Sequence, residues 1–145
     1  MILMTLFLLI SLRCIAPGYN QLYILRTEYE CNMLTWGNID YELSLLGIKE
    51  IKIVKAQIKH ETGNLTSRFC REQNNLFGMR LARRRATTAI GEGNHMAVYR
   101  SWKKSIEDYG IWQDYFYKGG DYYQFLSRHG YAEDIWYGYK LRRIK

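Results

Sequence analysis

The sequence predicts a domain of the α+β class that is predominantly α, with a small β-containing or irregular lobe inserted in its middle. Apolar residues recur at helical spacing before residue 63 and again after residue 101. Between these stretches, Gly- and Asn-containing polar segments alternate with short apolar ones, a pattern typical of loops and a small hairpin. The length of 145 residues suits one domain, and 48% hydrophobic and 24% charged residues are ordinary values for a globular protein.

Residues 1–20 form an apolar amino-terminal segment, and we expect the folded domain to span residues 21–145. The apolar run is too short to span a bilayer as a helix, but its length suits the central region of a signal peptide. No Lys or Arg precedes the run, and Arg13 stands directly before Cys14, which is unlike a lipoprotein cleavage site. Two interpretations therefore stay open, a signal peptide or a helix or strand that packs on the domain.

In the first half of the domain the apolar pattern predicts two helical stretches. Residues 22–46 look helical, with an interruption at residues 36–38 and an end at Gly47. The clearest helix spans residues 49–62, where apolar residues share one face and lysines lie mostly elsewhere. The pair Gly63-Asn64 is a strong stop signal, because glycine readily takes the left-handed conformation that follows a last helical turn.

The second half begins with the segment that we expect to form the small lobe. Residues 64–96 are predicted to be loops, with a hairpin over residues 79–99 that turns near residues 91–94. Helical patterning returns after Ser101, a suitable N-cap, and it places several aromatic residues on one apolar stripe. Two shorter helices are expected to follow, at residues 121–128 and 132–143.

The formal net charge of +7 favours a polyanionic partner, such as nucleic acid, an anionic membrane surface or an acidic cell wall, and does not choose among them. Residues 83–85 are three consecutive arginines that form either a phosphate-binding patch or a solvated loop. Cys14, Cys31 and Cys70 lack the spacing of a zinc site, as do His60 and His95, so no metal site is assigned. One disulfide can form if the chain is exported, but the sequence does not identify the pair.

Glu61 is the most informative single residue. It lies three positions after Ile58 and seven after Val54, which places it on the apolar face of its helix. It also lies in the last turn, where the helix dipole opposes a negative charge. Both effects favour the protonated carboxylic acid, which can donate its proton to a glycosidic oxygen. The alternative is a helix-end glutamate that pairs with Lys or Arg in solvent.

Four segments extend this interpretation. Residues 56–63 (Ala-Gln-Ile-Lys-His-Glu-Thr-Gly) resemble the "AQ…E-S/T-G" segment of the glucosaminidase family, glycoside hydrolase family 73. Residues 74–79 (Asn-Asn-Leu-Phe-Gly-Met) are similar to its "NNLFG" signature. Residues 99–109 resemble its "Y-x-S-W/Y…S-I/V…DY" stretch, and residues 130–141 its closing "GYA…Y…KL" helix. The resemblance covers roughly residues 45–143, with the four segments in the family's order.

This resemblance implies a lysozyme-like fold in which a helical lobe and a small β/loop lobe flank a glycan groove. It implies hydrolysis of the β-1,4 bond after N-acetylglucosamine in peptidoglycan, with Glu61 as the catalytic acid and with neither a metal nor an organic cofactor. The implied partners are peptidoglycan glycan strands, bound by a monomer that has no nucleic-acid partner and no stable membrane insertion. The implied location is the periplasm or cell wall if the amino terminus is a signal peptide, and otherwise a phage lysis or virion-associated role.

The second catalytic group is where the sequence departs from the family. Many members carry a Glu directly after a Thr-Thr pair, whereas here Thr87-Thr88 is followed by Ala89. Glu92 is the nearest carboxylate and either activates water over the groove or lies in a solvated turn. Two other routes are the 2-acetamido group of the substrate acting as the nucleophile, and Glu61 acting with a positioned water. Tyr99 matches the family's groove tyrosine, which would orient the acetamido group or stabilise the oxocarbenium ion, or else it is a core aromatic.

Four further residues are candidates for substrate contact. Asn75 and Phe77 belong to a turn that we interpret as architectural first and substrate-contacting second, with Asn75 bracing the loop and Phe77 in the core. Trp102 and Tyr109 would form a sugar-stacking platform or belong to the core. A muramidase or lytic transglycosylase is the rival enzyme, although its typical "GLMQ" loop is not found here. The rival without catalysis is a basic module that binds glycan or nucleic acid.

Overall fold

The computed structural model describes residues 33–129, 131, 134 and 136–144 of the chain. The chain divides into two compact units, residues 1–38 and 39–145, and only residues 33–38 of the first are described. Within that stretch, the backbone N–H of Asn38 donates to Thr35 Oγ1 (3.2 Å), and Asn38 Nδ2 donates to the carbonyl oxygen of Met33 (2.9 Å). The expected signal segment at residues 1–20, Cys14 and Cys31 lie outside the described residues.

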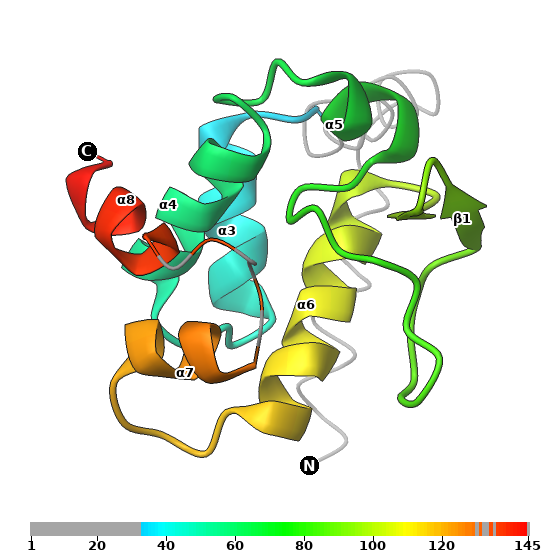
Figure 1. Ribbon diagram of the computed structural model, residues 1–145. Coiled ribbons are helices and arrows are strands. Elements are labelled where there is room, and N and C mark those ends of the chain that lie inside the picture. The colour runs from blue at the N-terminus through cyan, green and yellow to red at the C-terminus, as the bar shows by residue number, and fades with distance from the viewer. Residues whose placement is uncertain (1–32, 130, 132–133, 135, 145) are drawn as a thin grey trace, which may run out of the picture. The chain divides into compact units, whose positions relative to one another are not determined.

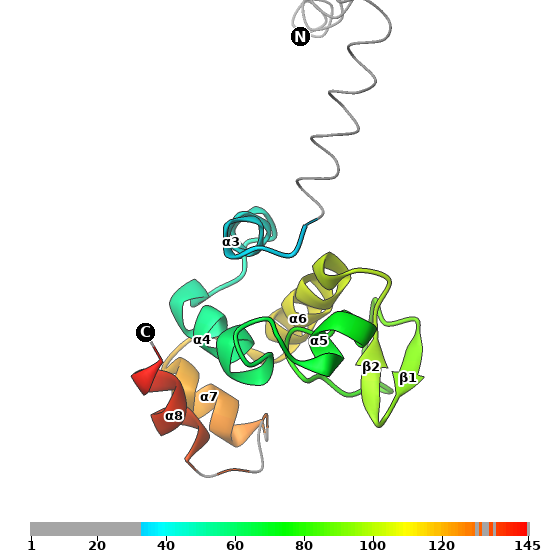
Figure 2. The ribbon, with the colours of Figure 1, turned by 90° about the horizontal axis from the view of Figure 1, so that it is seen from above.

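The described residues form a mostly helical arrangement with one small antiparallel sheet, which confirms the predicted fold class (Figure 1). The helices are α3 (Trp36–Leu45), α4 (Ile51–Glu61), α5 (Arg68–Gln73), α6 (Trp102–Phe116), α7 (Tyr122–Arg128) and α8 (Tyr137–Arg143). Strands β1 (Gly91–Gly93) and β2 (Met96–Val98) form the sheet. Within the unit of residues 39–145, the sheet lies on one side and helices α7 and α8 on the other (Figures 1 and 2). None of the described helices is long and apolar enough to cross a bilayer.

Helix α4 confirms the clearest helical prediction and carries Glu61 as its last residue. Its apolar face, with Val54 and Ile58, is fully buried. The helix ends as the Gly63-Asn64 signal predicted, because Gly63 has a φ of +54° and the N–H of Asn64 returns to the carbonyl oxygen of Lys59 (2.9 Å). In contrast, the interruption predicted at residues 36–38 is wrong, since α3 begins at Trp36 and includes all three residues.

Two corrections concern the segment of residues 64–96, which was predicted to be loops and a hairpin. Helix α5 was not predicted; it is six residues long, and Ser67 caps it by accepting a hydrogen bond from the N–H of Cys70 (3.2 Å). The hairpin exists, but residues 91–93 are its first strand rather than its turn. The turn consists of Asn94 and His95, whose φ angles of +50° and +64° suit a two-residue hairpin connection.

Helix α6 runs through the core and separates the sheet from the carboxyl-terminal helices. Its predicted apolar stripe is buried at Ile106, Tyr109 and Trp112, whereas Phe116 at its end is exposed. The ring of Tyr109 stacks on Phe77 with a centroid distance of 4.0 Å. Ser101 is the N-cap residue, but its side chain makes no capping hydrogen bond. Helix α7 is capped by Asp121, whose carboxylate accepts from the N–H of Gln124 (2.9 Å). These contacts hold helices α6 and α7 in place within the helical part of the fold.

Candidate active site

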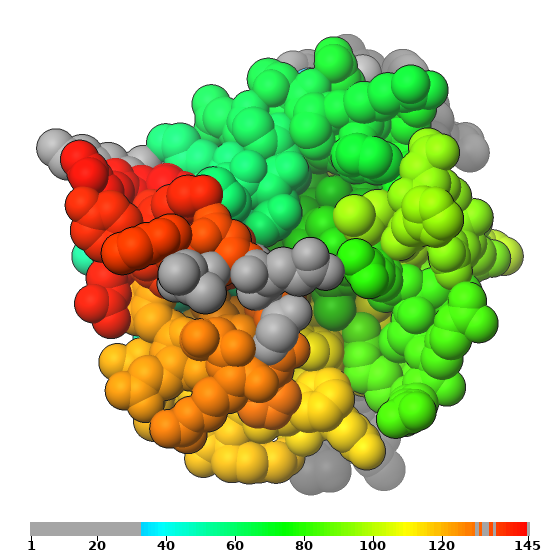
Figure 3. All heavy atoms as spheres, in the orientation of Figure 1, coloured from blue at the N-terminus to red at the C-terminus, as the bar shows by residue number. Residues whose placement is uncertain are grey.

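A cavity of about 680 Å³ opens beside the carboxyl end of α4. Figure 3 shows the face on which the surface is hollowed between this end of α4 and the segment that follows α5. Three parts of the chain line it: the end of α4, residues 78–85 with Met96, and the carboxyl-terminal part from Trp112 onward. Segments far apart in sequence therefore meet at one hollow, in the way that a glycan groove between two lobes requires.

Glu61 lies in the wall of this cavity. Its Oε1 accepts a hydrogen bond from the hydroxyl of Tyr137 in α8, at 2.8 Å. Burial raises the pKa of the Glu61 carboxyl above its ordinary value, and the hydrogen bond from Tyr137 and the nearby His60 offset only part of this effect. The carboxyl consequently holds a proton at a higher pH than an exposed glutamate, which is the property a general acid needs.

The other oxygen of Glu61 lies against Gly78, which also lines the cavity. A Cβ atom at position 78 would lie 3.0 Å from Glu61 Oε2, and Gly78 has a φ of +62°. Only glycine meets both conditions without strain. Asn75 holds this turn in place. Its Nδ2 donates to the carbonyl oxygens of Met79 and Ala97 (both 2.9 Å), and its Oδ1 accepts from the N–H of Met79 (3.1 Å).

Most of the residues predicted to contact substrate are buried. Phe77, Trp102 and Tyr109 are buried in the core and do not line the cavity, and Asn75 uses its amide for the bonds just described. Tyr99 is buried as well, and its hydroxyl donates to Asp108 Oδ2 at 2.7 Å. The core alternative therefore describes all of these side chains, because helical spacing alone could not distinguish a stripe that faces the core from one that faces a groove.

Glu92 does not line the cavity that contains Glu61. It lies in β1, its side chain is 35% exposed, and Oε2 lies 3.4 Å from the guanidinium of Arg83. The two residues line a separate cavity of about 360 Å³, together with Arg80, Leu81 and His95. The structure thus does not bring Glu92 together with Glu61, and the role of Glu92 as the second carboxylate stays a prediction.

The cavity contains functional candidates that the sequence did not reveal. Tyr137 belongs to the closing helix of the resemblance, but nothing in the sequence indicated that its hydroxyl would reach Glu61. Trp112 and Tyr131 supply aromatic surface to the cavity in place of the expected Trp102 and Tyr109. Asp134 is the second carboxylate among the described lining residues. Hydrogen bonds from the Lys140 side chain and from the backbone N–H of Trp136 lower its pKa, so it is ionised.

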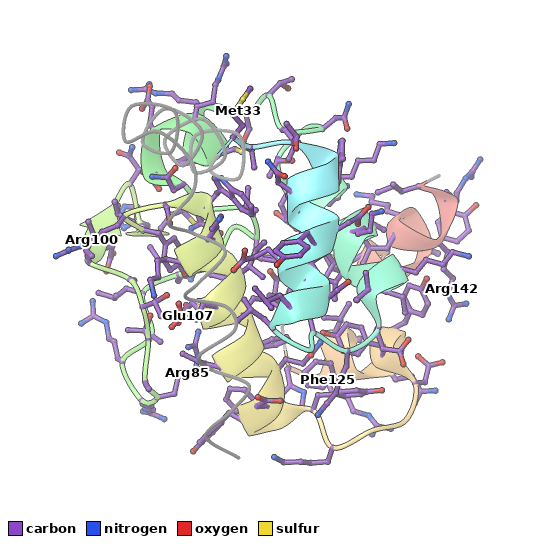
Figure 4. All side chains as sticks on the ribbon, turned by 180° about the vertical axis from the view of Figure 1, so that it is seen from behind. Met33, Arg85, Arg100, Glu107, Phe125 and Arg142 are labelled. Atoms are coloured by element: carbon purple, nitrogen blue, oxygen red, sulfur yellow. The ribbon has the colours of Figure 1, made fainter. Side chains whose placement is uncertain are left out.

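The arginine run also divides. Arg83 and Arg84 are exposed, as expected of a solvated loop, whereas the Arg85 side chain is only 7% exposed. Its guanidinium makes two hydrogen bonds to the fully buried carboxylate of Asp108, at 2.7 and 3.1 Å. Burial alone would raise the pKa of Asp108, but hydrogen bonds from Arg85, Tyr99 and Thr87 outweigh it and lower the pKa. The pair ties the loop to α6, beside which Arg85 lies in Figure 4. Arg85 is also one of the residues that line the cavity.

A carboxyl with a raised pKa, in a groove with aromatic and cationic walls, suits proton donation to a sugar–sugar oxygen. The described residues contain no cluster of three or more His, Cys, Asp or Glu side chains that could hold a metal ion. A comparison with known families agrees with this chemistry. Residues 38–145 match the model of the glucosaminidase family, described as mannosyl-glycoprotein endo-β-N-acetylglucosaminidase. No curated protein and no solved structure matched the chain. The match covers well over half of the sequence, and the chain therefore belongs to the glucosaminidase family of glycoside hydrolases.

Proposed function

We propose that this glycoside hydrolase cleaves the β-1,4 bond after N-acetylglucosamine in peptidoglycan, with Glu61 as the general acid. The observation that carries the proposal is the carboxyl of Glu61 in the cavity wall, partly desolvated and held at one oxygen by Tyr137. A helix-end glutamate that simply paired with Lys or Arg in solvent would have neither the desolvation nor the tyrosine partner.

In the proposed reaction the proton of Glu61 moves to the glycosidic oxygen as the bond from that oxygen to the sugar C1 breaks. The cleaved strand leaves as an alcohol, and C1 acquires oxocarbenium character until a nucleophile reaches it. Water finally adds to C1 and returns its proton to the ionised Glu61. The carboxyl is therefore an acid in the first step and a base in the second, and it ends the cycle protonated.

For the nucleophile we favour the 2-acetamido group of the substrate. Glu92 lies outside the cavity, and Asp134 is a weak base because Lys140 and the N–H of Trp136 already hold its oxygens. Attack by the acetamido oxygen needs a single protein acid and yields a product of retained configuration. The anomer released first, observed by proton NMR, tests this route. An initial α-anomer would contradict it and would point to a protein base such as Asp134.

The choice of peptidoglycan follows from the resemblance of the sequence to the glucosaminidase family, and the charge of the protein is compatible with it. The chain carries a net charge of +7, and Arg80 and Arg85 line the cavity, which suits the anionic wall polymer. The family description instead names a mannosyl glycoprotein as substrate. Digests of purified peptidoglycan and of a high-mannose glycoprotein separate the two substrates. We expect products from peptidoglycan that end in reducing N-acetylglucosamine by mass spectrometry. Reducing or anhydro muramic acid would identify a muramidase or lytic transglycosylase instead.

The role of Glu61 is tested by the substitution Glu61→Gln, which keeps the shape of the side chain and removes the acidic proton. We expect lysis to fall by at least about a hundredfold, in line with the loss of a general acid, while wall binding is retained. Glu72→Gln is the matched control, because Glu72 is an exposed residue of α5 that pairs with Arg68. If the Glu61→Gln variant lysed walls as fast as this control, the assignment of Glu61 would fail.

The proposal extends to the setting of the enzyme. We propose that it acts as a monomer on the wall, without a nucleic-acid partner, and is exported if residues 1–16 serve as a signal peptide. Attraction between a basic protein and an anionic wall weakens as salt screens it. Sedimentation of the protein with isolated walls should therefore decrease between low and high salt, and light scattering should give the mass of one chain.

A further inference from the structure

A buried series of hydrogen bonds connects the carboxyl of Glu61 with the chain segment just before the other end of α4. Its side chains come from four different helices, and each residue is 6% exposed or less. They are, in order from the carboxyl, Tyr137, Gln57, Tyr109, Tyr122 and Gln113. Because each group is buried and lies within hydrogen-bond distance of the next, the donor and the acceptor of each bond in this series can be worked out.

The direction of the series is set by the backbone of Lys49. The N–H of Lys49 donates to Gln113 Oε1 (2.7 Å), and Gln113 Nε2 donates to the carbonyl oxygen of Lys49 (3.0 Å). A backbone N–H can only donate and a carbonyl can only accept, so the amide of Gln113 has one permitted orientation. Its second N–H must then be the donor toward Tyr122, whose hydroxyl oxygen lies 2.7 Å away.

From Gln113 the donors follow one another in a single direction. Tyr122 accepts from Gln113 and donates to Tyr109, the hydroxyl oxygen 2.7 Å away. Tyr109 in turn has one proton, and it donates this proton to Gln57 Oε1 at 2.6 Å. The amide of Gln57 is thereby oriented with Nε2 toward Tyr137, where it donates over 3.4 Å. Tyr137 has accepted a hydrogen bond, so its own proton is directed to Glu61 Oε1.

We propose that this one-way series is a positioning device that decides which oxygen of Glu61 carries the transferable proton. With the Tyr137 proton directed at Oε1, the acid's own proton is kept on Oε2. Oε2 is the oxygen beside Gly78, where the absence of a side chain leaves that oxygen open to the cavity. The inference rests on the proposed role of Glu61 and assigns Gln57, Tyr109, Tyr122 and Gln113 as positioning residues.

The competing state is a rotation of the Gln57 amide by half a turn. Its oxygen would then face Tyr137 and attract the hydroxyl proton away from Glu61. In the intact series this rotation would reverse Tyr109 and Tyr122 and bring the Tyr122 proton against the N–H of Gln113. Two donors facing each other in the interior are costly, so the series opposes the rotation. Without the hydroxyl of Tyr122 or Tyr109 in the middle of the series, no two donors are forced together and the Gln57 amide can rotate.

The test compares Tyr122→Phe with Tyr117→Phe. Tyr117 is also buried, its ring lies 4.8 Å from that of Tyr122, and its hydroxyl donates to the carbonyl oxygen of Gly120 outside the series. Both variants lose one hydrogen-bonded tyrosine hydroxyl, which is buried in Tyr122 and partly buried in Tyr117. The pKa of Glu61 is read from the ¹³C shift of its carboxyl carbon, assigned with Glu61→Gln, and kcat and KM are measured against pH.

We expect Tyr122→Phe to raise the pKa of Glu61, because the hydrogen bond from Tyr137 lowers it. We also expect kcat to fall about three- to tenfold with KM unchanged, as the partial loss of one hydrogen bond would cause. Tyr117→Phe should leave both unchanged. Tyr109→Phe deletes the next hydroxyl in the series and must raise the pKa of Glu61 as well. It serves as the second variant if Tyr122→Phe does not fold.

An unchanged Glu61 pKa in both Tyr122→Phe and Tyr109→Phe would overturn the inference. Tyr137→Phe removes the hydroxyl that donates to Glu61, so it gives the largest change in the pKa of Glu61 that the series can produce. If Tyr137→Phe shifts the pKa and the two deeper variants do not, the series beyond Tyr137 has no positioning role. The carboxyl titration does not depend on catalysis, so this failure differs from failure of the proposed function, which is lysis that survives Glu61→Gln.

Discussion

The two walls of the cavity are built on different principles. The wall that carries Glu61 consists of helices whose buried tyrosine and glutamine side chains hydrogen-bond one another among stacked aromatic rings. The facing segment, residues 82–90, forms neither helix nor strand, and the Arg85–Asp108 pair holds its middle to α6. The proposed proton donor thus lies in the wall with the denser hydrogen bonding, while the facing wall depends on a small number of strong contacts.

Loss of the strongest of these contacts, the Arg85–Asp108 pair, should destabilise the facing wall the most. Arg85→Ala leaves the buried carboxylate of Asp108 without its main partner, and we expect unfolding free energy to fall by about 3–5 kcal/mol. Arg83→Ala is the matched control, because the Arg83–Glu92 pair is exposed and should contribute less than about 1 kcal/mol. Urea unfolding followed by circular dichroism measures both, and equal losses would contradict the distinction.

The contact between the two walls at Gly78 can be tested separately from stability. Gly78→Ala places a methyl group 3.0 Å from Glu61 Oε2, and we expect activity to fall by up to about a hundredfold, as displaced catalytic groups do. Gly47→Ala imposes the same kind of backbone strain, with a φ of +64° and no atom within 4 Å of the new Cβ. Both should lose about 1 kcal/mol of stability. The rate of lysis, measured at equal fractions of folded protein, distinguishes the two variants. Equal activity would mean that the contact between Gly78 and Glu61 does not matter for catalysis.

The buried carboxyl of Glu61 in the helical wall makes the stability of the fold depend on pH. Since burial raises the folded-state pKa of Glu61 above 4.5, its neutral form is favoured on folding. The contribution of the neutral Glu61 to the free energy of unfolding is fully present below the pKa that Glu61 has in the unfolded chain. It is lost as the pH rises through the pKa of Glu61 in the folded protein. Glu61→Gln cannot ionise, so it should be more stable than the native protein at neutral pH and lose this advantage in acid. Melting temperatures at pH 4 and 7 measure this, and a constant difference would contradict the raised pKa.

The smallest effect should come from Glu92. Glu92→Gln removes an exposed ion pair with Arg83, so stability should change by less than about 1 kcal/mol, and lysis should be unchanged. A loss of a hundredfold or more would restore Glu92 as the group that activates water. That result would mean that the hairpin reaches the Glu61 cavity during catalysis.

Helices with a clear apolar face and a stop signal were predictable, and Glu61 could be found because its position on such a face is a local property of the sequence. Other features were not predictable. Helix α5 is shorter than the window over which periodicity is visible, and the placement of Asn94 and His95 in the turn depends on how β1 and β2 pair. The burial of Trp102 and Tyr109 could not be predicted either, because spacing shows which residues share a helix face and not what covers it.

The contacts of the site were the least predictable part. Tyr137 lies 76 residues from Glu61, and Arg85 lies 23 residues from Asp108, so both pairs depend on tertiary folding. The sequence of three arginines offered no reason to separate a buried Arg85 from an exposed Arg83. Resemblance to a family can indicate the acid, but it cannot indicate which hydroxyl holds that acid.

The distance along the chain between Glu61 and Tyr137 has a consequence for synthesis. A ribosome completes the helix that ends in Glu61 long before it reaches the last helix, so a nascent chain contains the acid without its partner. The tyrosine hydroxyl reaches the carboxyl only once α8 has been made and folded onto α4. A chain that ends before residue 137 therefore contains the carboxyl of Glu61 without the hydroxyl that hydrogen-bonds to it in the complete fold.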